Sequence, residues 1–214
     1  MSDLEGFHPG AFSKADTAPD AVFYAEPRFV THIDDGAARA VTALYRTVLP
    51  ENGVILDLMS SWVSHLPEEM MFERVIGHGM NAAELADNPR LDDHFVADLN
   101  LAPSLPLADR SLDGACLCAS VQYLQQPVAV FRELARVLRP GAPLVITFSD
   151  RFFPTKAVAI WQALDGPDRQ KLVSICATRA GFTEIETGEV RPDADDPAWQ
   201  DPIWAVIGRV PIPV

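Results

Sequence analysis

An acid and two serines follow the first short apolar run that is typical of a buried strand. Asp57, Ser60 and Ser61 come after the apolar residues 54–56, and a turn signal over 50–53 precedes that run. A β-branched and apolar run that ends in small polar residues predicts a strand that leads into a loop. In open α/β sheets, ligands bind at the carboxyl ends of the strands. The stretch therefore predicts a polar ligand site at a sheet edge.

Three later apolar runs also end in residues that can bind a ligand. Asp98 follows the expected strand 93–97, Ala119 and Ser120 follow 113–118, and Arg151 follows 144–148. A guanidinium group at such a position is suited to bind a substrate carboxylate or phosphate. An ordinary solvated role for Arg151 remains open.

The order of the expected elements predicts a parallel sheet. Strands alternate with helices along the first 150 residues, which is typical of right-handed βαβ units. Strands are expected at 54–57, 74–77, 93–97, 113–118 and 144–148, and helices at 34–49, 82–86 and 127–138. Helices at 155–164 and 168–180 and strands at 182–187 and 203–209 follow, with an acidic, proline-rich loop at 193–202. We expect one domain overall, in which an N-terminal arm and helix over 1–50 pack on residues 51–214.

Composition limits the class of partner. The chain has 214 residues and a formal net charge of −13, so it repels nucleic acid and anionic lipid, while a cationic small molecule is compatible with it. Its apolar runs are too short to span a membrane, and the first five residues lack a signal-peptide pattern. Three cysteines are too few for a disulfide framework, which favours a cytoplasmic location. No metal is expected, because Cys116 and Cys118 have no second ligand pair.

Residues 111–146 carry a specific family resemblance. They contain SLDGA at 111–115, QYL at 122–124 and FRELARVLRPGAPLVI at 131–146. This passage resembles the fourth strand, following helix and fifth strand of class I S-adenosylmethionine-dependent methyltransferases of the methyltransferase-11-like group. The resemblance covers about residues 50–209. It implies a Rossmann-like, seven-stranded, mostly parallel sheet with helices on both faces and an antiparallel last strand. It also implies methyl transfer to a small-molecule acceptor, with S-adenosylhomocysteine as the product.

The resemblance also implies a set of cofactor contacts, in a loop that is poor in glycine. Asp57 matches the acid that ends the first strand, but Met59, Ser61 and Val63 stand where the family has glycines. Since Met59 and Val63 disfavour a positive φ, we expect the loop to follow another path. Ser60 and Ser61 are then candidate donors to the methionine carboxylate.

The remaining cofactor candidates lie after the second, third and fourth strands. Gly79 occupies the position of the family's ribose-binding acid, so the usual acceptor is missing. Asn81 is a candidate for one compensating hydrogen bond and Met80 for packing against adenine. Asp98 and the Leu99 amide match the adenine contacts, and Ala119 matches the backbone at the methionine end.

Four residues outside these motifs are candidates for contact with the acceptor. His32 and Tyr123 are weak candidates for catalysis. The imidazole of His32 can accept a proton near its ordinary pKa of about 6.5. Tyr24, in an N-terminal segment that covers the site in this fold, Tyr123 and Arg151 are candidates for substrate binding. Capping, packing and solvation are the alternative roles of each.

Three functions remain open from the sequence. The first is a methyltransferase. The second is an inactive relative that binds or scaffolds, which Met59, Val63 and Gly79 favour. The third is a nicotinamide-dependent oxidoreductase, which is disfavoured because no Gly-x-Gly-x-x-Gly motif follows a strand.

Overall fold

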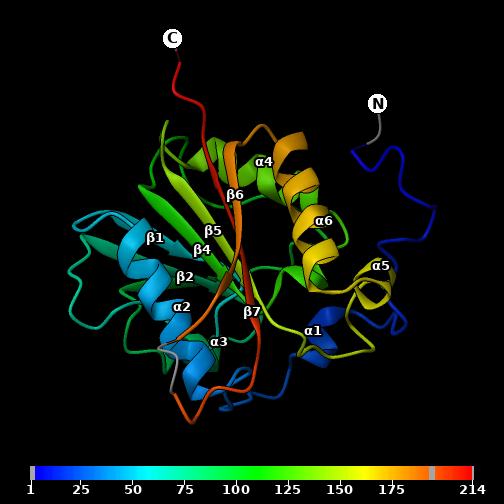
Figure 1. Cartoon of the computed structure of the whole chain (residues 1–214), viewed down its shortest axis with the longest axis horizontal. Helices are drawn as coiled ribbons and strands as arrows, with labels where there is room; N and C mark the ends of the chain where they lie inside the picture. Colours follow the sequence, from blue (N-terminus) through cyan, green and yellow to red (C-terminus); the bar gives the residue numbers. More distant parts are fainter. Residues whose placement is uncertain (1–2, 193–195, 214) are drawn as a thin grey trace.

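The computed structural model describes residues 3–192 and 196–213, and it contains a seven-stranded sheet with the order β3-β2-β1-β4-β5-β7-β6. Strands β1 to β5 are parallel, and β7 is antiparallel to both β5 and β6 (Figure 1). The strands are β1 (Val54–Asp57), β2 (Arg74–Gly79), β3 (Asp93–Val96), β4 (Gly114–Cys118), β5 (Pro143–Phe148), β6 (Thr183–Val190) and β7 (Ile203–Arg209). This architecture confirms the predicted Rossmann-like sheet with an antiparallel last strand.

Helices cover both faces of the sheet because alternate strand residues point to opposite sides. Helix α2 (Asp35–Val48) packs on one face, where Val41 and Tyr45 meet Ile55 and Val145. Helices α4 (Pro127–Val137) and α6 (Gly166–Arg179) cover the other face, together with α5 (Ala159–Ala163) (Figure 1). Burial on both faces explains why the central strands β1, β4 and β5 are almost continuously apolar.

The strand order reverses between β1 and β4. From β1 the sheet continues through β2 and β3 on one side, and from β4 it continues through β5 on the other side. The carboxyl ends of these two neighbours form the crevice in which open α/β sheets bind ligands. Short helix α3 (Ala82–Ala86) and the 3-10 turn η1 (Val121–Tyr123) begin near this edge.

An N-terminal segment, residues 20–32, starts with the short helix α1 (Asp20–Phe23) and lies over the same edge. Lys156, which is completely buried, donates to the Ala18 carbonyl at 2.9 Å and pairs with Asp16 at 3.0 Å and Asp20 at 3.1 Å. These bonds anchor the start of the segment to the chain that follows β5.

The expected bounds of three elements were wrong. Strand β2 continues through His78 to Gly79, because it keeps its pairing with β3 up to Val96. The expected helix 155–164 is helical only in α5, and β6 runs past 187 to Val190 alongside β7. The expected loop 193–202 lies partly outside the described residues, as do the first two residues of the N-terminus. No helix in the described ranges has the length and apolar character needed to cross a membrane.

Candidate functional site

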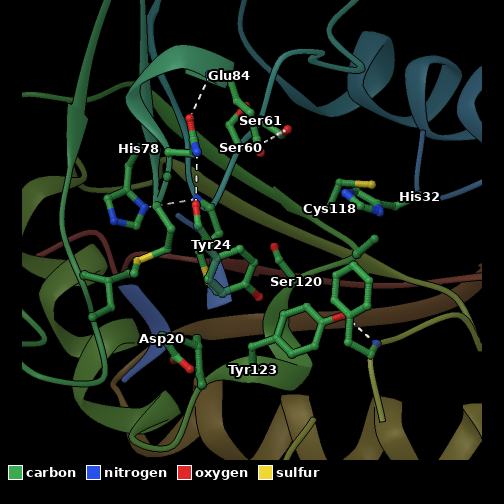
Figure 2. A pocket seen from close by; sticks show the side chains of 18 of the residues that line it. Asp20, Tyr24, His32, Ser60, Ser61, His78, Glu84, Cys118, Ser120 and Tyr123 are labelled. Atoms are coloured by element: carbon green, nitrogen blue, oxygen red, sulfur yellow. Dashed lines mark hydrogen bonds between the residues drawn. The ribbon is translucent and has the colours of Figure 1, made fainter. Parts of the chain in front are cut away.

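A cavity of about 290 Å³ opens at the carboxyl ends of β1, β2 and β4. One end, the sheet-edge end, is lined by Met59, Ser60, Ser61, His78, Gly79, Met80, Asn81, Glu84, Ala97, Asp98, Leu99 and Ala119. The other end, the aromatic end, is lined by Tyr24, His32, Tyr123, Arg151, Phe152 and Phe153. Figure 2 shows residues of both ends around this cavity. All predicted site residues except Asp57 line it.

The loop after β1 takes a left-handed turn at Met59, where φ is +55°. His78 holds this turn, since its Nδ1 accepts from the Met59 amide at 3.2 Å and its carbonyl accepts from the Ser60 amide at 2.6 Å. The expectation that Met59 excludes a positive φ was therefore wrong. A non-glycine residue in this region is strained, and such strain persists only where neighbouring contacts hold it.

The His78 ring is a neutral tautomer with its proton on Nε2. Nδ1 accepts from Met59, so Nε2 donates to the Ala97 carbonyl at 3.0 Å. Burial lowers the pKa of His78 to about 4, because a charged imidazole loses its hydration there. The ring thus joins the loop after β1 to the end of β3.

Asp57 lies beneath the loop rather than in the cavity lining. It is buried and accepts from the Ser60 hydroxyl at 2.6 Å and from the Ser64 hydroxyl. Burial raises the pKa of this carboxyl. Asp57 also borders a smaller adjoining cavity of about 50 Å³, which His32 and His65 share. Its visible role is to anchor the loop through two serine hydroxyls.

Gly79 has no room for a side chain. A Cβ there would lie 2.5 Å from the Ser60 carbonyl oxygen and 3.2 Å from Leu85 Cδ2. The family's ribose-binding acid is therefore excluded from this position by the path of the preceding loop.

Glu84 is a carboxylate at this edge that the sequence reasoning missed. It is buried in the cavity wall, where Oε2 accepts from the Ser61 hydroxyl at 2.6 Å and Oε1 from the Arg28 amide at 2.7 Å (Figure 2). Nothing in the sequence distinguished it from an ordinary acid in the first turn of a helix.

Asn81 and Asp98 both act as caps within the cavity wall. The Asn81 Oδ1 caps α3, and its Nδ2 donates to the Tyr24 carbonyl at 3.0 Å and the Ala25 carbonyl at 3.1 Å. Asp98 accepts from the Asn100 amide at 2.9 Å. Asn81 therefore ties the N-terminal segment to α3, while Leu99 and Met80 supply apolar surface beside Asp98.

The backbone after β4 is left-handed at Ala119, with φ of +50°. The Ser120 hydroxyl that follows is buried and has no hydrogen-bond partner within residues 3–192 and 196–213. An unpartnered buried hydroxyl is destabilising unless a ligand or water satisfies it. Its position in the cavity lining makes this hydroxyl available to a ligand or to water.

At the aromatic end, the rings pack around Phe153. Its ring lies 5.7 Å from His32 and 6.0 Å from Tyr123, and its amide donates to the Tyr123 hydroxyl at 3.0 Å. Arg151 lies at the rim and donates from Nε to Asp201 at 2.6 Å. His32 reaches the cavity with its ring exposed, and partial desolvation lowers its pKa.

Comparison with known proteins supports the family resemblance. A family model described as a methyltransferase domain matches residues 68–146. The malonyl-[acyl-carrier protein] O-methyltransferase of Hahella chejuensis (strain KCTC 2396) is 26% identical over 175 residues, which are 78% of this chain and 60% of that protein. The resemblance to class I S-adenosylmethionine-dependent methyltransferases is confirmed. The chain spans less than two thirds of that relative's length.

Solved structures share the fold of this chain. The [4+2]-cyclase SpnF aligns with a TM-score of 0.63 and 17% identity, over 90% of this chain and 92% of that one. Phosphoethanolamine N-methyltransferase 2 of Haemonchus contortus, solved with S-adenosyl-L-methionine, aligns with a TM-score of 0.60 and 15% identity, over 84% of this chain and 54% of that one. At these identities the likeness shows the fold alone.

The matching methyltransferase-domain model supports S-adenosylmethionine as the cofactor, and the lining of the sheet-edge end fits it. Met59 and Ala119, where the backbone is left-handed, and Gly79 line this end. Asp98 and Glu84 place carboxylate oxygens in the wall, and the Ser120 hydroxyl lacks a partner among the described residues.

Proposed function

We propose that the protein transfers the methyl group of S-adenosylmethionine to a small-molecule acceptor. The observation that carries the proposal is one cavity with two chemically different ends: a polar end at the strand termini and an aromatic end under the N-terminal segment. A donor at the first end and an acceptor at the second would lie in contact. Methyl transfer from a sulfonium needs mainly this alignment and the exclusion of water.

Cofactor binding would rest on the loop after β1 and on Asp98. The Ser61 amide and the Ser120 hydroxyl would face the methionine part, and Asp98 with the Leu99 amide would face the adenine. Position 79 has no room for an acidic side chain. Glu84, on α3 in the cavity wall, is therefore our candidate for binding the ribose hydroxyls.

His32 is our candidate for a base. Its ring reaches the cavity at the aromatic end, and its lowered pKa keeps it neutral at pH 7. No hydrogen bond to its ring is present in the described part of the chain. An acceptor that must lose a proton would give it to this imidazole, whereas an acceptor that is already anionic would need no base.

Label transfer tests the proposed class of acceptor. The protein is incubated with methyl-labelled S-adenosylmethionine and a cell extract that has been separated into small molecules and macromolecules. We expect the label in the small-molecule fraction, and a His32→Gln variant shows whether the reaction uses that base. Label found only in the macromolecular fraction would contradict the proposal.

A non-catalytic relative is the second candidate, and Gly79 is the observation that favours it. Loss of a charged hydrogen bond at the ribose weakens binding by about 1.5–3 kcal/mol unless another group replaces it. The SpnF neighbour is named a cyclase, so the fold itself does not decide between the candidates. Cofactor binding without transfer to any fraction would support this second candidate.

A further inference from the structure

Arg151 lies at the rim of the aromatic end, and its Nη donors are not engaged by any described side chain. Building on the proposed function, we propose that the acceptor is an anionic small molecule, and that Arg151 binds its carboxylate. The net charge of −13 is compatible instead with a cation, so the donors of Arg151 and the total charge lead to opposite expectations.

Asp20 and Glu84, the carboxylates of the cavity wall other than Asp98, already accept hydrogen bonds from the protein. Asp20 pairs with Lys14 and with Lys156, and it accepts a hydrogen bond from the side-chain Nδ2 of Asn100 at 3.0 Å. Both oxygens of Glu84 accept hydrogen bonds, one from Ser61 and one from Arg28. A cationic acceptor would find no unengaged carboxylate there among residues 3–192 and 196–213.

The aromatic faces are also engaged with a cation of the chain itself. The Arg28 guanidinium carbon lies 4.5 Å from the centre of the Phe23 ring and 5.8 Å from the centres of the Tyr24 and Phe153 rings. An ammonium group binds aromatic rings through the same attraction, so Arg28 would compete with it and repel it. Lys156, which pairs with Asp16 and Asp20, also lies 5.3 Å from the Phe23 ring centre.

Arg151 has donors to spare. Only its Nε is hydrogen-bonded to another side chain in the described ranges, and this bond to Asp201 holds the guanidinium at the cavity rim. The Nη donors are then available to a carboxylate, which guanidinium binds through two parallel hydrogen bonds.

Matched probes test this inference. Phenylacetate, phenylacetamide and phenethylamine share one ring and differ in charge, and their binding is titrated in the presence of S-adenosylhomocysteine. We expect phenylacetate to bind about tenfold or more tightly than the amide, since hydrogen bonds to charged groups are the stronger ones. We expect the amine to bind most weakly. Tighter binding of the amine than of the acid would overturn the inference.

Variants separate a direct role of Arg151 from a general effect. Arg151→Gln keeps a donor for Asp201 but loses the charge, and it should weaken phenylacetate about tenfold; Arg151→Lys should restore part of that loss. Arg132→Gln is the matched control, because Arg132 pairs with Asp3 on the surface and does not line the cavity. Acid binding that Arg151→Gln leaves unchanged would overturn the inference. S-adenosylhomocysteine is titrated alone with each variant, so a failure of cofactor binding is seen separately.

Discussion

The Met59 amide donates to Nδ1 of His78 across 3.2 Å, and this bond holds a methionine in a left-handed turn where the family has glycine. The loop after β1 therefore keeps a sharp turn without its usual residue. His78 can do this only as a neutral ring, which makes the loop sensitive to pH.

His78 predicts a loss of stability in mild acid. Its pKa is about 4 in the folded protein, below the ordinary value of 6.5, so the unfolded chain binds the proton more readily. The stabilisation is fully present above pH 6.5 and is lost as the pH falls toward 4. Between pH 7 and pH 5 this amounts to about 2 kcal/mol, on the scale of 1.36 kcal/mol per pKa unit.

His78→Asn is the matched variant, because Oδ1 of asparagine replaces Nδ1 as the acceptor and does not titrate. Urea unfolding at pH 7 and pH 5 gives the change in unfolding free energy for both proteins. We expect that change to be smaller in the variant by about 2 kcal/mol. An equal change in the two proteins would show that His78 does not titrate on unfolding. The difference between the two proteins does not include the contributions of His65 and Asp57 to the pH dependence, because both proteins contain these residues.

Two of the three positions where the family has glycine, Met59 and Val63, should respond in opposite ways to substitution by glycine. Met59 has a positive φ and Val63 does not. Met59→Gly should leave the unfolding free energy within about 1 kcal/mol of the wild type, since relief of strain offsets the lost side chain. Val63→Gly should lower it by about 1 kcal/mol or more, because glycine there only adds freedom to the unfolded chain. A larger loss for Met59→Gly than for Val63→Gly would contradict the strained turn.

Gly79 should not tolerate a Cβ. Gly79→Ala forces the Ser60 carbonyl to move, so we expect a loss of more than about 2 kcal/mol of stability and weaker cofactor binding. Gly188→Ala is the control, because a Cβ there would meet no atom within 4 Å and the residue lies in strand β6. Similar melting temperatures for the two variants would mean that the close approach at Gly79 is absent in solution.

Glu84 should matter for the cofactor and for the N-terminal segment together. Glu84→Gln removes the charge and one acceptor, so we expect S-adenosylhomocysteine to bind about tenfold more weakly. The amide of Arg28 should also exchange with solvent faster, because Oε1 no longer accepts from it equally well. Glu186→Gln on the exposed strand β6 serves as the control. Unchanged affinity would remove Glu84 from the proposed ribose contacts.

Much of the fold followed from the sequence, because periodicity and stop signals are local. Strands β1 and β7 and helices α2 and α4 lie where they were expected, to within one or two residues. Strand β2 was expected to end at Gly77, since His78 gives no local signal that its ring is buried and bonded on both nitrogens.

The site was harder to predict where the decisive contact joins distant residues. The sequence identified the loop after β1 but not its path, because Met59 is held by a side chain 19 positions away. Glu84 was missed for the same reason: its partners Ser61 and Arg28 are 23 and 56 positions away. Asp57 was expected to contact the cofactor; in the structure it lies beneath the loop and accepts from two serine hydroxyls.

Calorimetric titration with S-adenosylmethionine and then S-adenosylhomocysteine tests the proposed cofactor site most directly. We predict saturable binding of both in the micromolar range, weakened about tenfold or more by Asp98→Ala and unaffected by the surface variant Asp109→Ala. No binding at high ligand concentration, by a protein shown to be folded, would contradict the methyl-transfer proposal.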